Sequence, residues 1–232
     1  MANRYSYTKR KETKYFVSRT QYTILSSLLK SVMDVDKNSN DNGEYFVRSL
    51  YFDTLNRKDL MEKEAGINHR RKIRFRYYSE NPDFLKLETK EKINRYTIKK
   101  SDFITKEEAI KILDLDFNPI KDDNLKLYNH LLMFSYRPVV IIDYEREAYV
   151  SDNFNLRINF DKNIRGSSNC LDPFNEDLLM VPLIEPELYI LEVKHDGHLP
   201  EYIQQILATV DLTPVSYSKY YYGGLLWVYK HY

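Results

Sequence analysis

Apolar and polar residues alternate along many short segments of the chain, the pattern of β-strands with one buried face. Turn residues separate the segments, and strands do not alternate regularly with helices. This order favours antiparallel pairing and argues against a doubly wound parallel sheet. The pattern predicts about eight strands, over residues 10–17, 44–53, 68–78, 84–91, 95–100, 139–150, 155–161 and 187–194.

Helical signals are fewer. Four helices are expected, beginning at Ser18, at Thr105, near Asp123 and at Pro200. The first two begin with capping boxes, which Gln21 and Glu108 complete. The elements therefore predict an α+β fold.

The remaining segments lack a clear period. Residues 34–43 are polar and predict a loop, and residues 167–186 predict an irregular excursion. The aromatic tail from Tyr217 to Trp227 is expected to be core rather than a base-stacking platform. We expect a single domain over residues 1–232.

One predicted strand has two very different faces, because side chains alternate with period two. One face carries only cations, namely Arg70, Lys72, Arg74 and Arg76. The opposite face is more apolar, with Arg71, Ile73, Phe75 and Tyr77. A solvated face would carry mixed signs, because like charges on neighbouring positions repel. This strand therefore predicts a basic ladder backed by a core.

Other predicted strands repeat this division into a charged face and an apolar face. The residues that share the charged face of their own strand are Glu12 with Lys14; Lys86 with Glu88 and Lys90; Arg95 with Thr97 and Lys99; Tyr144 with Arg146; Arg157 with Asn159; and Glu192 with Lys194. For a single strand, a charged face in water explains the pattern as well. Its repetition along the chain favours a shared charged space.

A closed barrel of about eight strands has a narrow lumen that side chains line. If the charged faces point inward, the lumen is strongly cationic with a few carboxylates. Burying these charges is unfavourable unless a counter-ion neutralises them. The expected ligand is a dense polyanion together with a metal, because Arg forks bind phosphate oxygens in pairs and Lys adds point charges.

Composition narrows the choice. The 232-residue chain has 35 Lys and Arg against 34 Asp and Glu, so its net charge of +1 disfavours nucleic acid as a partner. The chain has only 6 Gly, and neither of the two glycine-rich phosphate-binding motifs, G-x-x-x-x-G-K-[ST] and G-x-G-x-x-G, occurs in it. The single cysteine excludes a disulfide within the chain and a Cys-based zinc site. No secretory signal is visible and the longest aliphatic run is residues 139–142, so we expect a soluble, cytoplasmic protein.

Several short motifs follow one another in an order that resembles a known family. They are RKETKY from Arg10, RSLYFDT from Arg48, KIRFR from Lys72, LETK from Leu87, YEREAY from Tyr144, LRI from Leu156, LEVK from Leu191 and SKY from Ser218. This order is similar to that of the VTC domain, the catalytic domain of vacuolar transporter chaperone polyphosphate polymerases and their bacterial relatives. These belong to the triphosphate tunnel metalloenzymes. The resemblance covers about residues 9–222.

The resemblance implies an antiparallel tunnel barrel, helices outside it, and a triphosphate or polyphosphate inside. It implies a catalytic set of phosphate-binding cations, namely Arg74, Arg76, Lys90, Arg146, Arg157 and Lys219. It adds further phosphate contacts from Lys14, Lys99, Tyr144 and Ser218, with Lys100 as the competitor of Lys99. Glu192 would hold Mn²⁺ or Mg²⁺. Ser216 departs from the pattern, because some members carry Lys there.

The residue types suit phosphoryl transfer without the family. This chemistry needs positioning and neutralised charge more than covalent catalysis. Three functions remain open: a polyphosphate polymerase that uses ATP or another triphosphate, a triphosphatase, and a polyphosphate-binding module without turnover. A triphosphatase must activate water, for which Glu12 or Glu88 could serve as base. A separate membrane-protein partner is implied only by the resemblance.

Other polar candidates have competing interpretations. Glu12 and Glu88 could be second metal ligands, but ion pairs with neighbouring Lys are favoured. Arg48 could reach the lumen or pair with Asp53. His195 and His198 are more simply exposed loop residues than a metal pair.

Overall fold

A computed structural model describes residues 5–8, 11–78, 82–93 and 96–230 of the chain. Arg10 and Arg95, named in the sequence patterns, lie outside these residues, as do the side chains of Tyr96 and Trp227. The described residues form six α-helices: α1 (Arg19–Lys30), α2 (Lys58–Glu64), α3 (Lys106–Leu113), α4 (Leu125–Met133), α5 (Glu201–Leu207) and α6 (Lys219–Lys230). Two short 3₁₀ turns occupy Asn118–Ile120 and Asp152–Phe154.

The described strands form one antiparallel sheet. They are β1 (Tyr5–Thr8), β2 (Lys11–Ser18), β3 (Asp34–Val35), β4 (Glu44–Asp53), β5 (His69–Tyr77), β6 (Phe84–Ile93), β7 (Tyr96–Thr105), β8 (Arg137–Ser151), β9 (Leu156–Ser167), β10 (Val181–Pro182) and β11 (Leu188–His195). The main path runs β1-β7-β6-β5-β4-β8-β9-β11-β2, with β10 paired to β9 and β3 paired to β8. The α+β class and the antiparallel sheet are confirmed.

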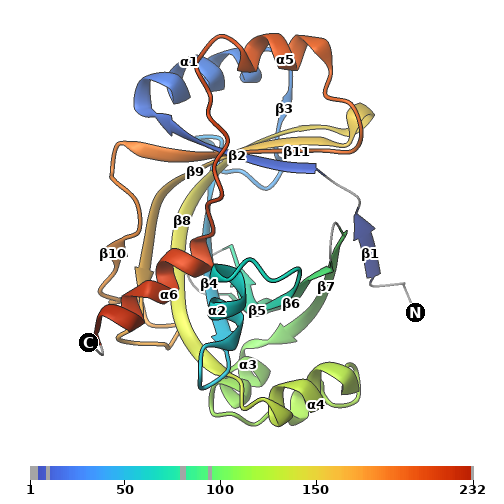
Figure 1. Cartoon of the computed structure of the whole chain (residues 1–232), viewed down its shortest axis with the longest axis vertical. Helices are drawn as coiled ribbons and strands as arrows, with labels where there is room; N and C mark the ends of the chain where they lie inside the picture. The colour runs from blue at the N-terminus through green and yellow to red at the C-terminus, as the bar shows by residue number, and fades with distance from the viewer. Residues whose placement is uncertain (1–4, 9–10, 79–81, 94–95, 231–232) are drawn as a thin grey trace.

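The sheet curls strongly, so that β2 and β11 lie opposite β6 and β7 (Figure 1). Among the described strands, no backbone pairing joins β2 to β1 or β7. A side-chain ion pair crosses from β2 to β6 instead, between Glu12 and Lys90 at 3.5 Å. The closed barrel therefore stays a prediction, whereas the curled sheet is observed.

Three apolar clusters surround the sheet. One cluster packs α3 and α4 on the strands β4, β5, β6 and β7, and it includes Ile73, Phe75 and Tyr77. A second packs α1 and α5 on β8, β9 and β11. Burial of these apolar faces under helices leaves the charged faces of the same strands toward the interior, as the alternation predicts. In Figure 1, α1 and α5 lie at one end and α3 and α4 at the other.

The third cluster holds α6, which the sequence did not predict as a helix. It packs on Val140 and Ile142, on the face of β8 that also carries Tyr144. The prediction that helices lie outside the sheet therefore fails for α6. Two glycines permit the close approach, because a Cβ on Gly223 would come within 2.9 Å of Ile142 and one on Gly224 within 2.8 Å of Leu60.

Local signals at the helix starts are confirmed. Ser18 and Thr105 are the N-caps of α1 and α3, each in a complete capping box. The short helix α2 and the strands β1, β3 and β10 were not predicted, because each is too short for a periodic signal. No helix in the described part of the chain is long and apolar enough to cross a membrane.

Candidate functional site: a cationic cavity

The concave side of the sheet encloses two adjoining cavities of about 540 Å³ and about 370 Å³. They share several lining residues, among them Lys72, Arg74 and Arg146. Their described linings together hold thirteen Lys and Arg against four Asp and Glu, an excess of nine positive charges. The whole chain has a net charge of only +1. Positive charge is thus concentrated inside, and acids prevail elsewhere.

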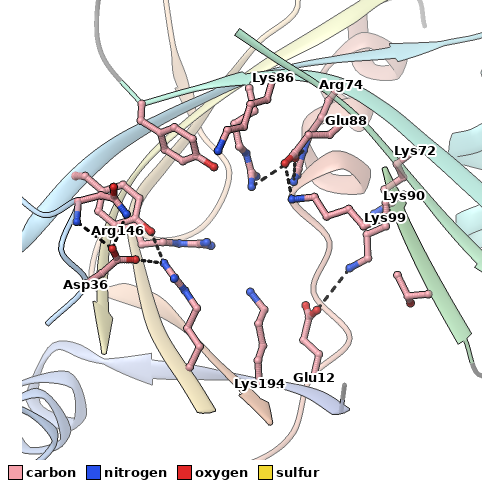
Figure 2. Close-up of a pocket in the computed structure, with 16 residues that line it drawn as sticks. Glu12, Asp36, Lys72, Arg74, Lys86, Glu88, Lys90, Lys99, Arg146 and Lys194 are labelled. Atoms are coloured by element: carbon pink, nitrogen blue, oxygen red, sulfur yellow. Dashed lines mark hydrogen bonds and ion pairs between the residues drawn. The ribbon is translucent and has the colours of Figure 1, made fainter. Parts of the chain in front are cut away.

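Every predicted site residue lines one or both cavities. The cations come from strands around the sheet and from the start of α6, and they are Lys14, Arg74, Arg76, Lys90, Lys99, Arg146, Arg157 and Lys219. Tyr144, Glu192 and Ser218 line the smaller cavity. In Figure 2 the labelled basic side chains from several strands converge on one space. Their individual roles stay predictions.

The choice between Lys99 and Lys100 follows from alternation along β7. Lys99 lines the larger cavity, and its Nζ lies 2.5 Å from Glu88. Lys100 lies on the other face, 3.9 Å from Asp102. Lys99 is therefore the residue of this pair that a ligand in the cavity would meet.

Glu88 organises the cations of β5 and β7. Its buried carboxylate accepts hydrogen bonds from Nε and Nη2 of Arg74 at 2.8 and 2.6 Å, and it lies 3.8 Å from Arg76. Burial alone would raise the pKa of Glu88, but the charges of Arg74, Arg76 and Lys99 outweigh it and lower the pKa. Glu88 thus orients cations, as the ion-pair interpretation predicts.

A second buried network joins β2, β8, β9, β11 and α6. Asp161 accepts two hydrogen bonds from Arg146, at 2.6 and 2.8 Å, and one from Lys219. Glu192 lies 3.0 Å from Lys14 and 3.4 Å from Arg146. Burial alone would raise the pKa of both carboxyl groups, but the surrounding cations outweigh this effect, and both pKa values are lowered. Both acids are therefore ionised and hold these cations in place.

Helix α6 places Ser218 and Lys219 at the cavity. The hydroxyl of Tyr220 donates a hydrogen bond to buried Asp53, which also accepts from backbone N–H groups around the start of α2. Lys72 of β5 donates to Ser218 at 2.8 Å. The beginning of α6 is thus fixed between two strands.

The two interpretations of Arg48 are both wrong. Its guanidinium pairs with Asp143 through two hydrogen bonds of 2.8 Å, and it donates to the carbonyl oxygens of Pro173 and Asn175. Arg48 and Asp143 are direct cross-strand neighbours of β4 and β8. Arg48 therefore ties down the excursion after β9, away from the cavity.

Several residues in or beside the cavities have no role in the predictions from sequence. Asp161, buried beside Arg146, follows Arg157 and Asn159 at the same two-residue spacing, so the strand period could have found it. Lys72, Lys86 and Lys194 stand on the predicted charged faces and line the cavities. Asp36, from the predicted polar loop, pairs with Arg157. No sequence signal connects that loop with β9.

A metal at Glu192 can be tested against the donor atoms. Among the described residues, no group of three or more His, Cys, Asp or Glu side chains could hold a metal ion. His195 and His198 therefore belong to no such group. Mg²⁺ commonly binds one or two carboxylates and completes its shell with water and phosphate oxygens. The ionised Glu192 carboxylate fits that use. The site therefore suits a metal that arrives with a triphosphate.

Lysine charge makes ligand binding depend on pH. Burial and the neighbouring charge of Arg146 lower the pKa of Lys194 to about 8, although Glu192 and Glu12 act in the opposite direction. Lys194 is therefore protonated below pH 8 and loses its charge above it. Burial and the charges of Lys14 and Lys90 also lower the pKa of Lys72. A bound polyanion favours the protonated lysines, so binding takes up protons.

We expect the affinity for tripolyphosphate to fall by about tenfold between pH 7.5 and 9, because Lys194, with a pKa of about 8, loses its charge over this range. Titration calorimetry at constant ionic strength measures this. Lys194→Arg keeps its charge and should flatten the decline. An affinity that is constant over this range in the wild-type protein would contradict the lowered pKa values.

The fold and the site define a protein with a curled antiparallel sheet around a cationic cavity. The family model named VTC domain matches residues 9–228, so the chain belongs to the VTC domain family. The resemblance drawn from the motifs is confirmed.

Two solved structures are similar to this chain. A proposed adenylate cyclase from Bacillus halodurans has a TM-score of 0.52 and 14% identity, covering 93% of this chain and 96% of that chain. A proposed adenylyl cyclase from Hippeastrum with a dominant triphosphatase activity has a TM-score of 0.47 and 15% identity, covering 85% of this chain and 84% of that chain. At such identity the first likeness supports the fold alone. No curated protein sequence matches the chain significantly.

Proposed function

We propose that this protein is a polyphosphate polymerase that transfers the γ-phosphoryl group of ATP to a growing inorganic polyphosphate chain. The observation that carries the proposal is the excess of nine positive charges along two adjoining cavities. This excess exceeds what one triphosphate neutralises, and it extends over a length that suits a chain of phosphates. Membership of the VTC domain family supports the same substrate class.

In the proposed reaction, a terminal oxygen of the polyphosphate chain bonds to the γ-phosphorus of ATP. The bond between that phosphorus and the β,γ-bridging oxygen breaks, and ADP leaves with the electron pair. Arg74 and Arg146, held by Glu88 and Asp161, would align the two anions and neutralise their repulsion. A metal bound at Glu192 would supply charge stabilisation on the phosphate oxygens.

The carboxylates favour this acceptor over water. A triphosphatase needs a general base, and the candidates were Glu12 and Glu88. Burial would raise the pKa of Glu12, but Lys194, Lys90 and Lys14 outweigh it and lower the pKa to about 2. The pKa of Glu88 is lowered as well. Weak bases of this kind activate water poorly, whereas a phosphate acceptor is already anionic.

Incubation of the protein with ATP and Mn²⁺ tests the proposal when long-chain polyphosphate and free phosphate are assayed separately. We expect polyphosphate to accumulate. Free phosphate without polyphosphate would indicate a triphosphatase. Binding of tripolyphosphate without either product would indicate a binding module, for which Ser216 in place of a family Lys leaves room.

A pair of arginine variants ties the result to the cavity. Arg74→Ala should weaken tripolyphosphate binding by about 1.5–3 kcal/mol, the contribution of a hydrogen bond to a charged group. Arg48→Ala is the matched control, because Arg48 is also paired with a carboxylate but lies outside the cavity. Equal losses in both variants would contradict the site. The cytoplasmic location and a separate membrane-protein partner remain predictions.

A further inference from the structure

An exposed aromatic ring lines one end of the larger cavity, and a second lies beside the lining residue Lys86. Tyr78, 41% exposed, lines this cavity and meets Tyr45 edge-on, with ring centroids 5.9 Å apart. Phe103 is 67% exposed. Between the rings lies the ammonium of Lys86, 5.1 Å from the Tyr78 centroid and 5.5 Å from the Phe103 centroid. The basic lining thus ends in a patch with flat apolar faces.

Strand register explains why these side chains gather. Lys86 of β6 is directly opposite Arg76 of β5 on one side and Phe103 of β7 on the other. Directly paired residues point to the same face of a sheet. Tyr78 follows Arg76 by two residues, just beyond the end of β5. The aromatic patch is therefore continuous with the phosphate-binding face.

The two ends of the cavity system differ in chemistry. Arg70 of β5 lines only the smaller cavity, and Tyr78, just beyond the end of β5, lines only the larger one. Between them, Lys72, Arg74 and Arg76 on the same face line both cavities. Eight residues of extended strand separate these ends by about 26 Å. The tyrosines that line the smaller cavity, such as Tyr51 and Tyr220, are buried, and its outer cations include Lys63 and Arg70.

A nucleoside triphosphate has the same polarity, with a flat base at one end and a row of phosphates at the other. Aromatic side chains bind bases by stacking without requiring a particular base. A phosphate near Arg76 would attract the Lys86 ammonium and uncover the ring of Tyr78. Asn38 lines the same cavity, where its carboxamide nitrogen donates a hydrogen bond to Asp36. An inorganic polyphosphate chain would have no use for the rings.

We infer that Tyr78, Phe103 and Lys86 form a nucleobase-binding platform at the larger cavity, so that the nucleotide enters there and the polyphosphate chain leaves past Lys63 and Arg70. This assignment rests on the proposed function. It deepens that function because it gives the cavity a direction and separates donor from product.

The test compares two ligands that share phosphates and differ in the base: the non-hydrolysable ATP analogue with a β,γ-imido link, and tripolyphosphate. Titration calorimetry at fixed ionic strength measures both affinities. Tyr78→Ala should bind the ATP analogue roughly tenfold more weakly, the effect of losing one stacking contact, and should bind tripolyphosphate within twofold of the wild-type protein. Tyr78→Trp should retain the analogue, because the ring face remains.

Tyr202→Ala is the matched control, since Tyr202 of α5 is 37% exposed, meets Phe154 edge-on and belongs to neither cavity lining. It should change neither affinity. Tyr78→Ala with unchanged analogue binding, or with equal losses for both ligands, overturns the platform. A wild-type protein that binds tripolyphosphate but shows no gain from the nucleoside also overturns it and leaves the cationic cavity standing. Failure to bind tripolyphosphate would refute the proposed function itself.

Discussion

Glu192→Gln should lower turnover with ATP and Mn²⁺ by about 100-fold or more, while tripolyphosphate still stabilises the folded protein. The amide keeps the shape of the side chain but removes the charge that a divalent metal requires. The cations around it remain, so the cavity becomes more positive and binds the anion at least as tightly. Turnover assays and thermal unfolding with and without tripolyphosphate separate the two effects, because ligand that binds only the native state raises its stability by mass action.

A second buried carboxylate serves as the control. Glu147 is 8% exposed and accepts hydrogen bonds from Tyr22 and Tyr149, outside the cavities. Glu147→Gln should keep turnover and the response to tripolyphosphate. If Glu192→Gln retains wild-type turnover with Mn²⁺, Glu192 is not the metal ligand, and that role passes to Glu12 or Glu88.

The period-two pattern of the sequence alone predicts most of the residues that line the cavities. It put Arg74 and Arg76 on one face of a strand and Phe75 on the other, because a strand leaves no freedom in this alternation. The same rule chose Lys99 over Lys100 once the strand was placed. Faces of strands are therefore readable from a single sequence.

Ion-pair partners on neighbouring strands cannot be predicted from this alternation. Arg48 pairs with Asp143 because β4 and β8 are neighbours in a register that brings these two residues together, 95 positions apart along the chain. The sequence offered only nearby Asp53. Asp161 is not among the predicted site residues for a related reason. Its role depends on ion pairs with Arg146 and Lys219, which come from another strand and a helix.

Helix α6 shows a different limit. Tyrosines and paired glycines are weak helix formers, so local propensity argued against a helix over Lys219–Lys230. Tertiary contacts override this, since the glycines allow the backbone to approach β8 and α2 where any larger residue would collide. The resemblance to the family predicts Lys219 and Ser218 as site residues, but no local pattern in the sequence predicts the helix that positions them.

Asp161→Ala should lower the free energy of unfolding by about 3–5 kcal/mol, the usual loss when one partner of a buried ion pair is removed. Asp161 is fully buried, and its loss removes the shorter ion pair of both Arg146 and Lys219, which then keep only the more distant Glu192. A polyphosphate in the cavity can replace that missing negative charge. The stabilisation by tripolyphosphate should therefore be larger in Asp161→Ala than in the wild-type protein, as measured by denaturant unfolding at matched ionic strength.

The control for this rescue is Asp143→Ala. Asp143 is 2% exposed and also binds an arginine through two hydrogen bonds, but on the opposite side of the sheet from the cavities. Its loss should destabilise the fold by a similar amount, because Arg48 is then left without its counter-charge. Tripolyphosphate cannot reach Arg48, so the shift in stability should equal that of the wild-type protein. Equal rescue of both variants would show that the anion acts on the whole protein surface, and it would remove the cavity as the polyanion site.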